Sequence, residues 1–179
     1  MCETADWEGA VEYDTFLKNA RENVELMKAR YADLMLNETE QETLSSIQNE
    51  IRILVIGTDR CDDSAGNIPV LARMAALSPR LKLRVLDSDK NAQLHQQYKV
   101  NGKRKTPVVL FMSEDNQEIC RWVERPNAAY KQVNQASKPL LDDRKAALKN
   151  LYSDSEILRQ SLGEFMNLLI RSDYVLGRA

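Results

Sequence analysis

Apolar residues recur at helical spacing through the first part of the chain. Between residues 16 and 34 they follow one another mostly at intervals of three and four, with charged residues between them. The stripe consists of Phe16, Leu17, Ala20, Val24, Met27, Tyr31 and Leu34. This pattern predicts an amphipathic helix. The segment from Thr39 to Glu42 has the sequence of a capping box and predicts a second, shorter helix that carries Leu44 and Ile47.

The middle of the chain contains four short apolar runs that are typical of strands. IRILVIG (51–57) is nearly all apolar and rich in β-branched residues, which predicts a central strand buried on both faces. The other three runs are LKLRVLD (81–87), TPVVLFM (106–112) and EICRWV (118–123). A helix predicted over 62–77, bent at Pro69, connects the first two strands, which makes them a parallel pair with a right-handed crossover. A short helix with Leu94 and Tyr98 on its apolar face follows, and a turn at 114–117 joins the last two strands into an antiparallel hairpin.

Helical patterns return after Pro126 and continue to the end of the chain. We expect an interruption at Pro139, and a second capping-box pattern from Ser153 to Glu156 opens a final helix. The chain then divides into an N-terminal helical extension (1–49), an α/β core (50–125) and C-terminal helices (126–179). Because 179 residues is the length of one domain, we predict a single α/β domain with a mixed four-stranded sheet flanked by helices.

Charge and hydropathy exclude several function classes. The net charge of −2 gives no global reason to bind nucleic acid or an anionic membrane. No apolar run approaches the about 20 residues that span a bilayer. The start, MCETADWEGAVEYD, lacks the apolar core of a secretion signal. We therefore expect a cytoplasmic protein that binds neither nucleic acid nor membranes.

The three cysteines, Cys2, Cys61 and Cys120, argue against a disulfide framework. They are far apart, and the only histidine is His95, so no metal site is predicted. We expect His95 on the polar side of its helix. Cys120 alternates with Arg121 on the hairpin and is predicted to be a packing residue. Cys2 lies near a terminus with nothing to fix its position relative to Cys61.

Cys61 is the strongest candidate for chemistry. In TDRCDDSAGNIP it follows a predicted strand and begins a predicted helix, where free backbone N–H groups and the helix dipole favour the nucleophilic thiolate. Arg60 also favours the thiolate, whereas Asp62 and Asp63 disfavour a second negative charge beside them. The sequence leaves the balance between these effects open.

Taken together, these elements and motifs resemble the thioredoxin family. The resemblance rests on the order β-α-β-α-β-β-α, on Cys61 after the first buried strand, on Pro69 in the next helix and on Thr106-Pro107 at the third strand. The stretches TDRCDDSAGNIP, QQYKVNGKRKTP and WVERP, with the N-terminal helices, are similar to a bacterial branch of that family. The resemblance implies a thioredoxin-like fold, a cis bond before Pro107 and pairing of the Thr106 backbone with substrate.

Three departures from the family pattern shape the expected activity. Arg60 replaces an aromatic residue, Ser64 replaces the second cysteine, and the apolar residues 54–56 leave no buried acid on the first strand. A serine hydroxyl cannot resolve a mixed disulfide, so the resemblance implies monothiol chemistry. Cys61 would attack protein or small-molecule disulfides, or exchange small-thiol adducts with glutathione or a similar thiol as co-substrate and no other cofactor. Arg60, Ser64, Thr106 and Pro107 are expected to contact the substrate.

Two alternatives stay open. The basic residues Lys103, Arg104 and Lys105 form either a solvated loop or a set of contacts for an anionic substrate. The chain as a whole is either the monothiol oxidoreductase or a catalytically decayed binding module, which would use its helical extensions as a surface for a protein partner.

Overall fold

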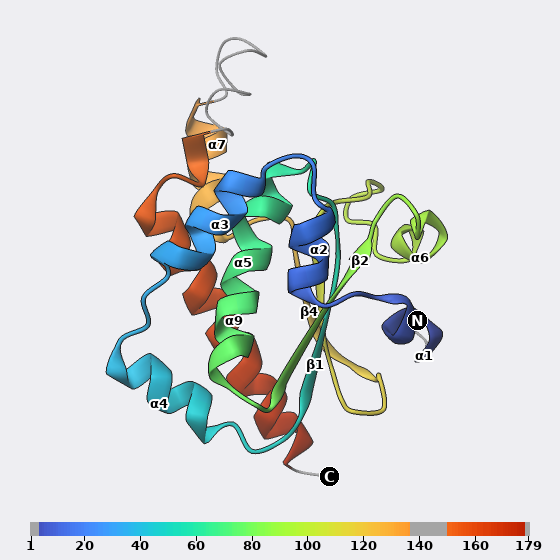
Figure 1. Ribbon diagram of the computed structural model, residues 1–179, viewed down its shortest axis with the longest axis vertical. Helices are drawn as coiled ribbons and strands as arrows, with labels where there is room; N and C mark the ends of the chain where they lie inside the picture. The colour runs from blue at the N-terminus through green and yellow to red at the C-terminus, as the bar shows by residue number, and fades with distance from the viewer. Residues whose placement is uncertain (1–3, 137–149, 178–179) are drawn as a thin grey trace.

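A mixed four-stranded sheet forms the centre of the molecule (Figure 1). The computed structural model describes residues 4–136 and 150–177. The strands are β1 (Ile51–Gly57), β2 (Leu81–Asp87), β3 (Val108–Met112) and β4 (Glu118–Val123), in the spatial order β2-β1-β3-β4. β1 pairs parallel with β2 and antiparallel with β3, and β3 pairs antiparallel with β4. The predicted fold class, the parallel pair and the hairpin are therefore confirmed.

Helices cover both faces of this sheet. The described helices are α1 (Thr4–Gly9), α2 (Tyr13–Asn19), α3 (Val24–Asp33), α4 (Glu38–Ser46), α5 (Asp62–Leu77), α6 (Ala92–Gln96), α7 (Asn127–Ala136) and α9 (Ser155–Leu176). In Figure 1, α3, α5 and α9 lie on one side of the strands, and α1 and α6 lie on the other. Among the described helices, none is long and apolar enough to cross a membrane.

β1 supplies side chains to the cores on both faces. Ile53 and Val55 belong to the cluster that includes residues of α5 and α9, whereas Leu54 and Ile56 belong to the cluster with Trp7. All four side chains are fully buried. This arrangement follows from the two-residue alternation of a strand, and it confirms the prediction of a central strand buried on both faces.

The apolar stripe over 16–34 does not form one helix, which corrects the sequence prediction. It is divided between α2 and α3, and Asn23 between them has a left-handed φ of 54°. The carboxylate of Asp59 accepts hydrogen bonds from the amides of Arg21 (2.7 Å) and Glu22 (3.1 Å), and the Asn23 side chain donates to the Asp59 carbonyl. A residue far along the chain thus stabilises the break.

Both capping boxes also differ from their predicted positions. The first uses Asn37 and Glu40, whose side chains and amides exchange two hydrogen bonds of 2.9 Å, and Thr39 lies inside α4. At the start of α9, Asp154 is the cap and accepts from the Glu156 amide. Asparagine and aspartate cap helices at least as well as serine and threonine do. Asn37 and Asp154 therefore occupy the N-cap positions in place of Thr39 and Ser153. The interruption expected at Pro139 lies outside the described residues.

Candidate active site

The candidate site lies where β1 ends and α5 begins. Gly57 closes β1, and a Cβ there would come within 3.0 Å of Ile68 and 3.2 Å of the Ser64 hydroxyl. The glycine therefore allows the strand end and the first turns of α5 to approach closely. After a three-residue loop, Cys61 occupies the N-cap position of α5, as the sequence predicted.

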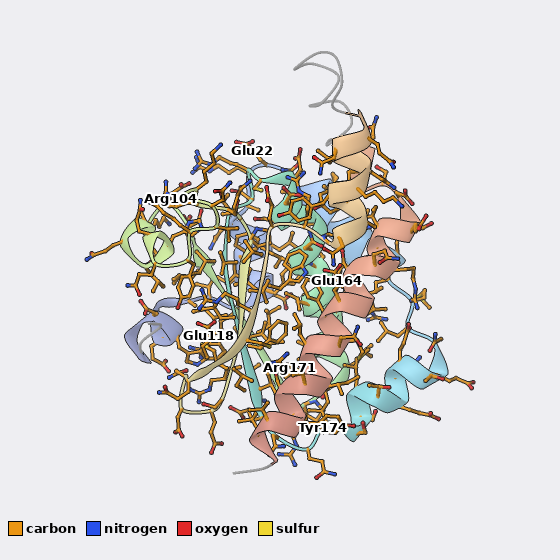
Figure 2. All side chains as sticks on the ribbon, turned by 180° about the vertical axis from the view of Figure 1, so that it is seen from behind. Glu22, Arg104, Glu118, Glu164, Arg171 and Tyr174 are labelled. Atoms are coloured by element: carbon orange, nitrogen blue, oxygen red, sulfur yellow. The ribbon has the colours of Figure 1, made fainter. Side chains whose placement is uncertain are left out.

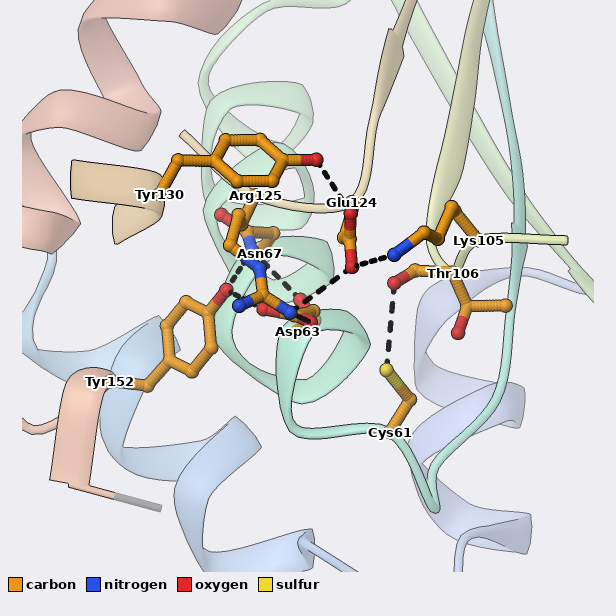
Figure 3. Close-up of polar contacts among 9 residues, drawn as sticks. All are labelled: Cys61, Asp63, Asn67, Lys105, Thr106, Glu124, Arg125, Tyr130 and Tyr152. Carbon is orange, nitrogen blue, oxygen red and sulfur yellow. Dashed lines mark hydrogen bonds and ion pairs between the residues drawn. The ribbon is translucent and has the colours of Figure 1, made fainter. Parts of the chain in front are cut away.

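Cys61 faces the loop that precedes β3. Its Sγ lies 3.5 Å from the carbonyl oxygen of Thr106, and the Thr106–Pro107 peptide bond is cis (Figure 3). Cys61 and Thr106 are half-buried, and Pro107 is buried. The structure thus brings together three of the residues that sequence reasoning chose, although 45 residues separate Cys61 from Thr106.

Ser64 lies one turn into α5 and is fully buried. Its hydroxyl accepts a hydrogen bond from the Thr58 amide at 3.4 Å. This contact ties the loop before Cys61 to the helix after it. The Ser64 side chain therefore faces the protein interior, where it supports the shape of the loop.

An open cleft of about 570 Å³ adjoins the Cys61 thiol. Its lining residues are Thr58, Arg60, Cys61, Ser88, Asp89, His95, Lys103, Arg104 and Thr106. Arg60 forms an ion pair with Asp89 inside this lining. Lys105 is not part of it, because its ammonium group turns to Glu124 at 2.7 Å. The predicted basic loop is therefore divided, with two residues in the cleft and one in a separate network.

The position of His95 also differs from the sequence prediction. It is only 2% exposed, and its Nε2 donates a hydrogen bond to the Lys105 carbonyl at 2.8 Å. Burial lowers the pKa of His95 below its ordinary value, and the charge of Arg104 acts in the same direction. The short helix α6 packs against the loop before Pro107, so its polar side faces protein instead of solvent.

Asp63 lies in a different environment from the one that the sequence predicts. It was paired with Asp62 as a charge acting on Cys61, but its carboxylate is buried and turned toward Arg125 and Tyr152 (Figure 3). Asp63 Oδ2 lies 2.6 Å from Arg125 Nη2, and Oδ1 accepts a hydrogen bond from the Tyr152 hydroxyl. Burial raises the pKa of Asp63 to about 6, although Arg125 and Tyr152 oppose this shift. The structure therefore has a buried acid on α5, bonded to Arg125 and Tyr152, whereas residues 54–56 of β1 carry none.

The contacts of Asp63 extend into a network that reaches the loop before Pro107. Glu124 accepts from Arg125 (3.1 Å), from Lys105 (2.7 Å) and from the Tyr130 hydroxyl (2.6 Å). Burial would raise the pKa of Glu124, but the hydrogen bonds from Lys105 and Tyr130 and the charge of Arg125 lower it overall. On the other side, the Asn67 side chain donates a hydrogen bond to the Tyr152 hydroxyl (3.1 Å) and accepts one from the Ser161 hydroxyl. The Ser161 Oγ lies 2.7 Å from Asn67 Oδ1, so α5, α9 and the end of β4 share one set of polar contacts.

Glu124 holds an uncommon backbone conformation in this network. Its φ is 70°, in the left-handed region, and its amide donates to the Pro107 carbonyl at 2.8 Å. A non-glycine residue keeps such a conformation when surrounding contacts determine it. The motif WVERP marks these residues in the sequence, but no local pattern pointed to Tyr152 as their partner.

The other cysteines lie away from this chemistry. Cys120 is half-buried on β4, with its Sγ 3.5 Å from the Ser172 hydroxyl of α9, and burial raises its pKa. It packs against the main core, as predicted. Cys2 lies outside the described residues. Among the residues that the structure describes, no group of three or more His, Cys, Asp or Glu side chains is arranged to hold a metal ion.

The comparisons with known proteins agree with this fold. The family model for thioredoxin matches residues 10–138, so the chain belongs to the thioredoxin family. No curated protein matches the sequence. Among solved structures, the chain is similar to a protein of unknown function from Pseudomonas aeruginosa, with a TM-score of 0.74, 21% identity and full coverage of both chains. It is also similar to an HIV epitope-scaffold, with a TM-score of 0.71, 20% identity and coverage of 94% of this chain and 98% of that one. At these identities the two structures support the fold alone.

Proposed function

We propose that this protein is a thiol–disulfide exchange enzyme of the monothiol type, with Cys61 as its nucleophile. The observation that carries the proposal is the position of the Cys61 thiol. It lies at the N-terminus of a 16-residue helix, beside the Thr106–Pro107 loop and at the edge of an open cleft. A thiolate at a helix N-terminus is stabilised by free amides and by the helix dipole, and the cleft gives a disulfide access to it.

The proposed exchange uses one thiol of the site, because Ser64 stands where the second cysteine of a C-x-x-C pair would lie. The Cys61 thiolate attacks one sulfur of a disulfide R–S–S–R, which forms a Cys61–S–S–R bond and releases R–S⁻, and this product takes a proton from water. A second thiol from solution then attacks the mixed disulfide and regenerates the free Cys61. Ser64 has no sulfur to perform this step and its hydroxyl is buried. A low-molecular-weight thiol such as glutathione is therefore the proposed co-substrate.

The substrate loop is proposed to act through Thr106. Its carbonyl oxygen faces Cys61, so a bound disulfide would lie between this loop and the start of α5. Arg60 borders the same cleft from the other side. Pro107 is buried, and we propose that it shapes the loop instead of contacting the substrate directly.

The first test is adduct formation on the intact chain. The protein is incubated with oxidised glutathione at neutral pH, and the site of the added mass is mapped after digestion. We expect one glutathione on Cys61, removed again by dithiothreitol, and no adduct at this position in a Cys61→Ser variant. A Cys120→Ser variant is the matched control and should react like the wild type, because Cys120 lies beneath α9. Absence of any Cys61 adduct in the wild type would contradict the proposal.

One contact favours a binding module as the second candidate. The hydrogen bond from Cys61 to the Thr106 carbonyl requires the thiol proton, and a thiolate would lose it. If this contact keeps the thiol protonated, the site would serve as a docking surface for an extended segment of a protein partner. That candidate predicts no exchange with any disulfide, together with unchanged partner binding in Cys61→Ser.

A further inference from the structure

The cleft beside Cys61 carries positive charge without matching negative partners. Lys103 and Arg104 line it and are exposed, and among the described residues neither forms an ion pair. The cleft's other charged residues, Arg60 and Asp89, neutralise each other in an ion pair. The first turn of α5 adds the positive end of its dipole at Cys61. The lining therefore presents two uncompensated cations next to the thiol.

A tight turn holds these two cations in place. Val100 and Lys103 exchange two backbone hydrogen bonds, of 2.9 and 3.1 Å, around Asn101 and Gly102. Asn101 and Gly102 have φ values of 50° and 71°, the left-handed conformations that an Asn-Gly pair adopts readily. Figure 2 shows Arg104 on this loop, beside α6. The positive side of the cleft is thus built on ordered backbone.

His95 gives an independent indication of a ligand in the same cleft. It lines the cleft, it is 98% buried, and its Nδ1 has no hydrogen-bond partner among the described residues. A carbonyl only accepts hydrogen bonds, so the contact with Lys105 places the ring proton on Nε2 and leaves Nδ1 as an acceptor. A buried acceptor without a donor is uncommon in proteins. A ligand N–H group would satisfy it once the cleft lining opens to Nδ1, which is buried in this structure.

We infer that this cleft binds the carboxylate-bearing half of a low-molecular-weight disulfide, and that Cys61 therefore exchanges preferentially with anionic disulfides. Lys103 and Arg104 bind the carboxylate, and His95 Nδ1 accepts an N–H of a peptide-like ligand. The volume of about 570 Å³ suits a small molecule of this kind. The inference rests on the proposed function and adds the class of substrate. In the reaction the anionic disulfide loses one half as a free thiol, and the other half becomes bonded to Cys61.

Three symmetrical disulfides of similar size test the charge preference. They are 3,3′-dithiodipropionate (anionic), 2-hydroxyethyl disulfide (neutral) and cystamine (cationic). The rate of adduct formation on Cys61 is measured for each by intact mass, and is divided by the rate of the same disulfide with free 2-mercaptoethanol. We expect the corrected rates to fall in the order anionic, neutral, cationic, and the differences to shrink in 0.5 M salt, because exposed charges are screened there.

A charge-removing variant identifies the residues responsible. In Lys103→Gln/Arg104→Gln the ratio of the dithiodipropionate rate to the 2-hydroxyethyl disulfide rate should fall roughly three- to tenfold, the size expected for the loss of two exposed ion pairs, whereas any general effect on Cys61 cancels in the ratio. The matched control is Lys82→Gln, which removes a positive charge at the second residue of β2, at the end of the strand away from Asp87 and the cleft. It should leave all three rates unchanged.

The outcomes separate this inference from the proposed function. If all three disulfides react with Cys61 at equal corrected rates, the charge preference is wrong and the exchange activity stands. If none reacts, the proposed function fails. Oxidised glutathione, which adds amide N–H groups to its carboxylates, should react faster than dithiodipropionate after the same correction. Equal corrected rates for the two disulfides would show that His95 does not accept a hydrogen bond from the ligand.

Discussion

Two adjacent aspartates in α5 have different environments. Asp62 is half-exposed, whereas Asp63 is 7% exposed and lies between Arg125 and Tyr152. A carboxylate exposed to solvent is strongly hydrated, and burial removes that hydration. Arg125 and Tyr152 replace part of it, yet the pKa of Asp63 is still raised to about 6. The protonation of this one side chain should therefore be visible in the stability of the whole protein.

Stability should depend on pH through Asp63. Its folded-state pKa of about 6 lies above the ordinary value of 3.8, so the folded state binds this proton more tightly than the unfolded state does. The stabilisation that this tighter proton binding gives is fully present below about pH 4. It is lost as the pH rises through 6, and the free energy of unfolding falls by roughly 3 kcal/mol in total. Urea unfolding from pH 4 to 7 measures it as the difference in unfolding free energy between the wild type and Asp63→Asn.

That difference should decrease as the pH rises. Other titrating groups cancel in the comparison, because both proteins contain them. A difference that stays constant, or that increases with pH, would show that the folded state does not raise the pKa of Asp63.

At the scale of the element, α5 depends on a glycine in its first half. Gly66 packs against Tyr152, and a Cβ at this position would lie 2.1 Å from a ring carbon. The ring cannot easily move, because its hydroxyl bonds Asp63 and Asn67 and the Arg30 guanidinium lies over its face at 5.5 Å. The close approach of α5 to Tyr152 therefore outweighs the low intrinsic helix propensity of glycine.

Gly66→Ala should destabilise the protein by about 1–3 kcal/mol, the usual cost of overpacking, although alanine favours a helix by about 1 kcal/mol over glycine. Gly163→Ala in α9 is the matched control. Among the described residues, no atom beyond its chain neighbours and its own stretch of helix backbone lies within 4 Å of the Cβ that it adds, so it should raise stability by about 0.4–1 kcal/mol. Urea unfolding at neutral pH measures both, and a Gly66→Ala protein as stable as the wild type would contradict the packing argument.

At the scale of the whole molecule, the two tryptophans report on opposite faces of the sheet. Trp7 belongs to the cluster under α1 and α6 and lies between the guanidinium groups of Arg52 (5.3 Å) and Arg84 (4.9 Å). Trp122 belongs to the cluster under α9, where its Nε1 donates to Glu164 at 2.6 Å. Because β1 contributes side chains to both clusters, neither face can keep its core when the sheet is lost.

Both faces should unfold in one transition. In Trp7→Phe the remaining fluorescence follows Trp122, and in Trp122→Phe it follows Trp7. For each variant, the midpoint of urea unfolding seen by fluorescence should coincide with the midpoint seen by far-UV circular dichroism, as for a single cooperative domain. Separate midpoints in either variant would show that the N-terminal extension unfolds independently of the α5–α9 side.

Much of the fold could be predicted because it depends on patterns that are local in the chain. The two-residue alternation and the apolar run of β1, the helix period of α5 and the turn before β4 each indicate an element without knowledge of its neighbours. The order of these elements then restricts the sheet to a few topologies. Cys61 was found in the same way, because a strand followed by a helix start places a residue at an N-cap wherever the rest of the chain lies.

The remaining features depend on partners that only the tertiary structure brings together. The break between α2 and α3 is held by Asp59, 38 residues from Arg21, and the environment of Asp63 is set by Arg125 and Tyr152, which are 62 and 89 residues away. The burial of His95 depends on its contact with the Lys105 carbonyl, which belongs to a loop whose path the sequence does not reveal. The sequence by itself therefore determined the elements, their order and the position of the thiol. Only the tertiary structure decided which charges face that thiol and which are buried elsewhere, because electrostatic partners are set by distance in space and not by distance along the chain.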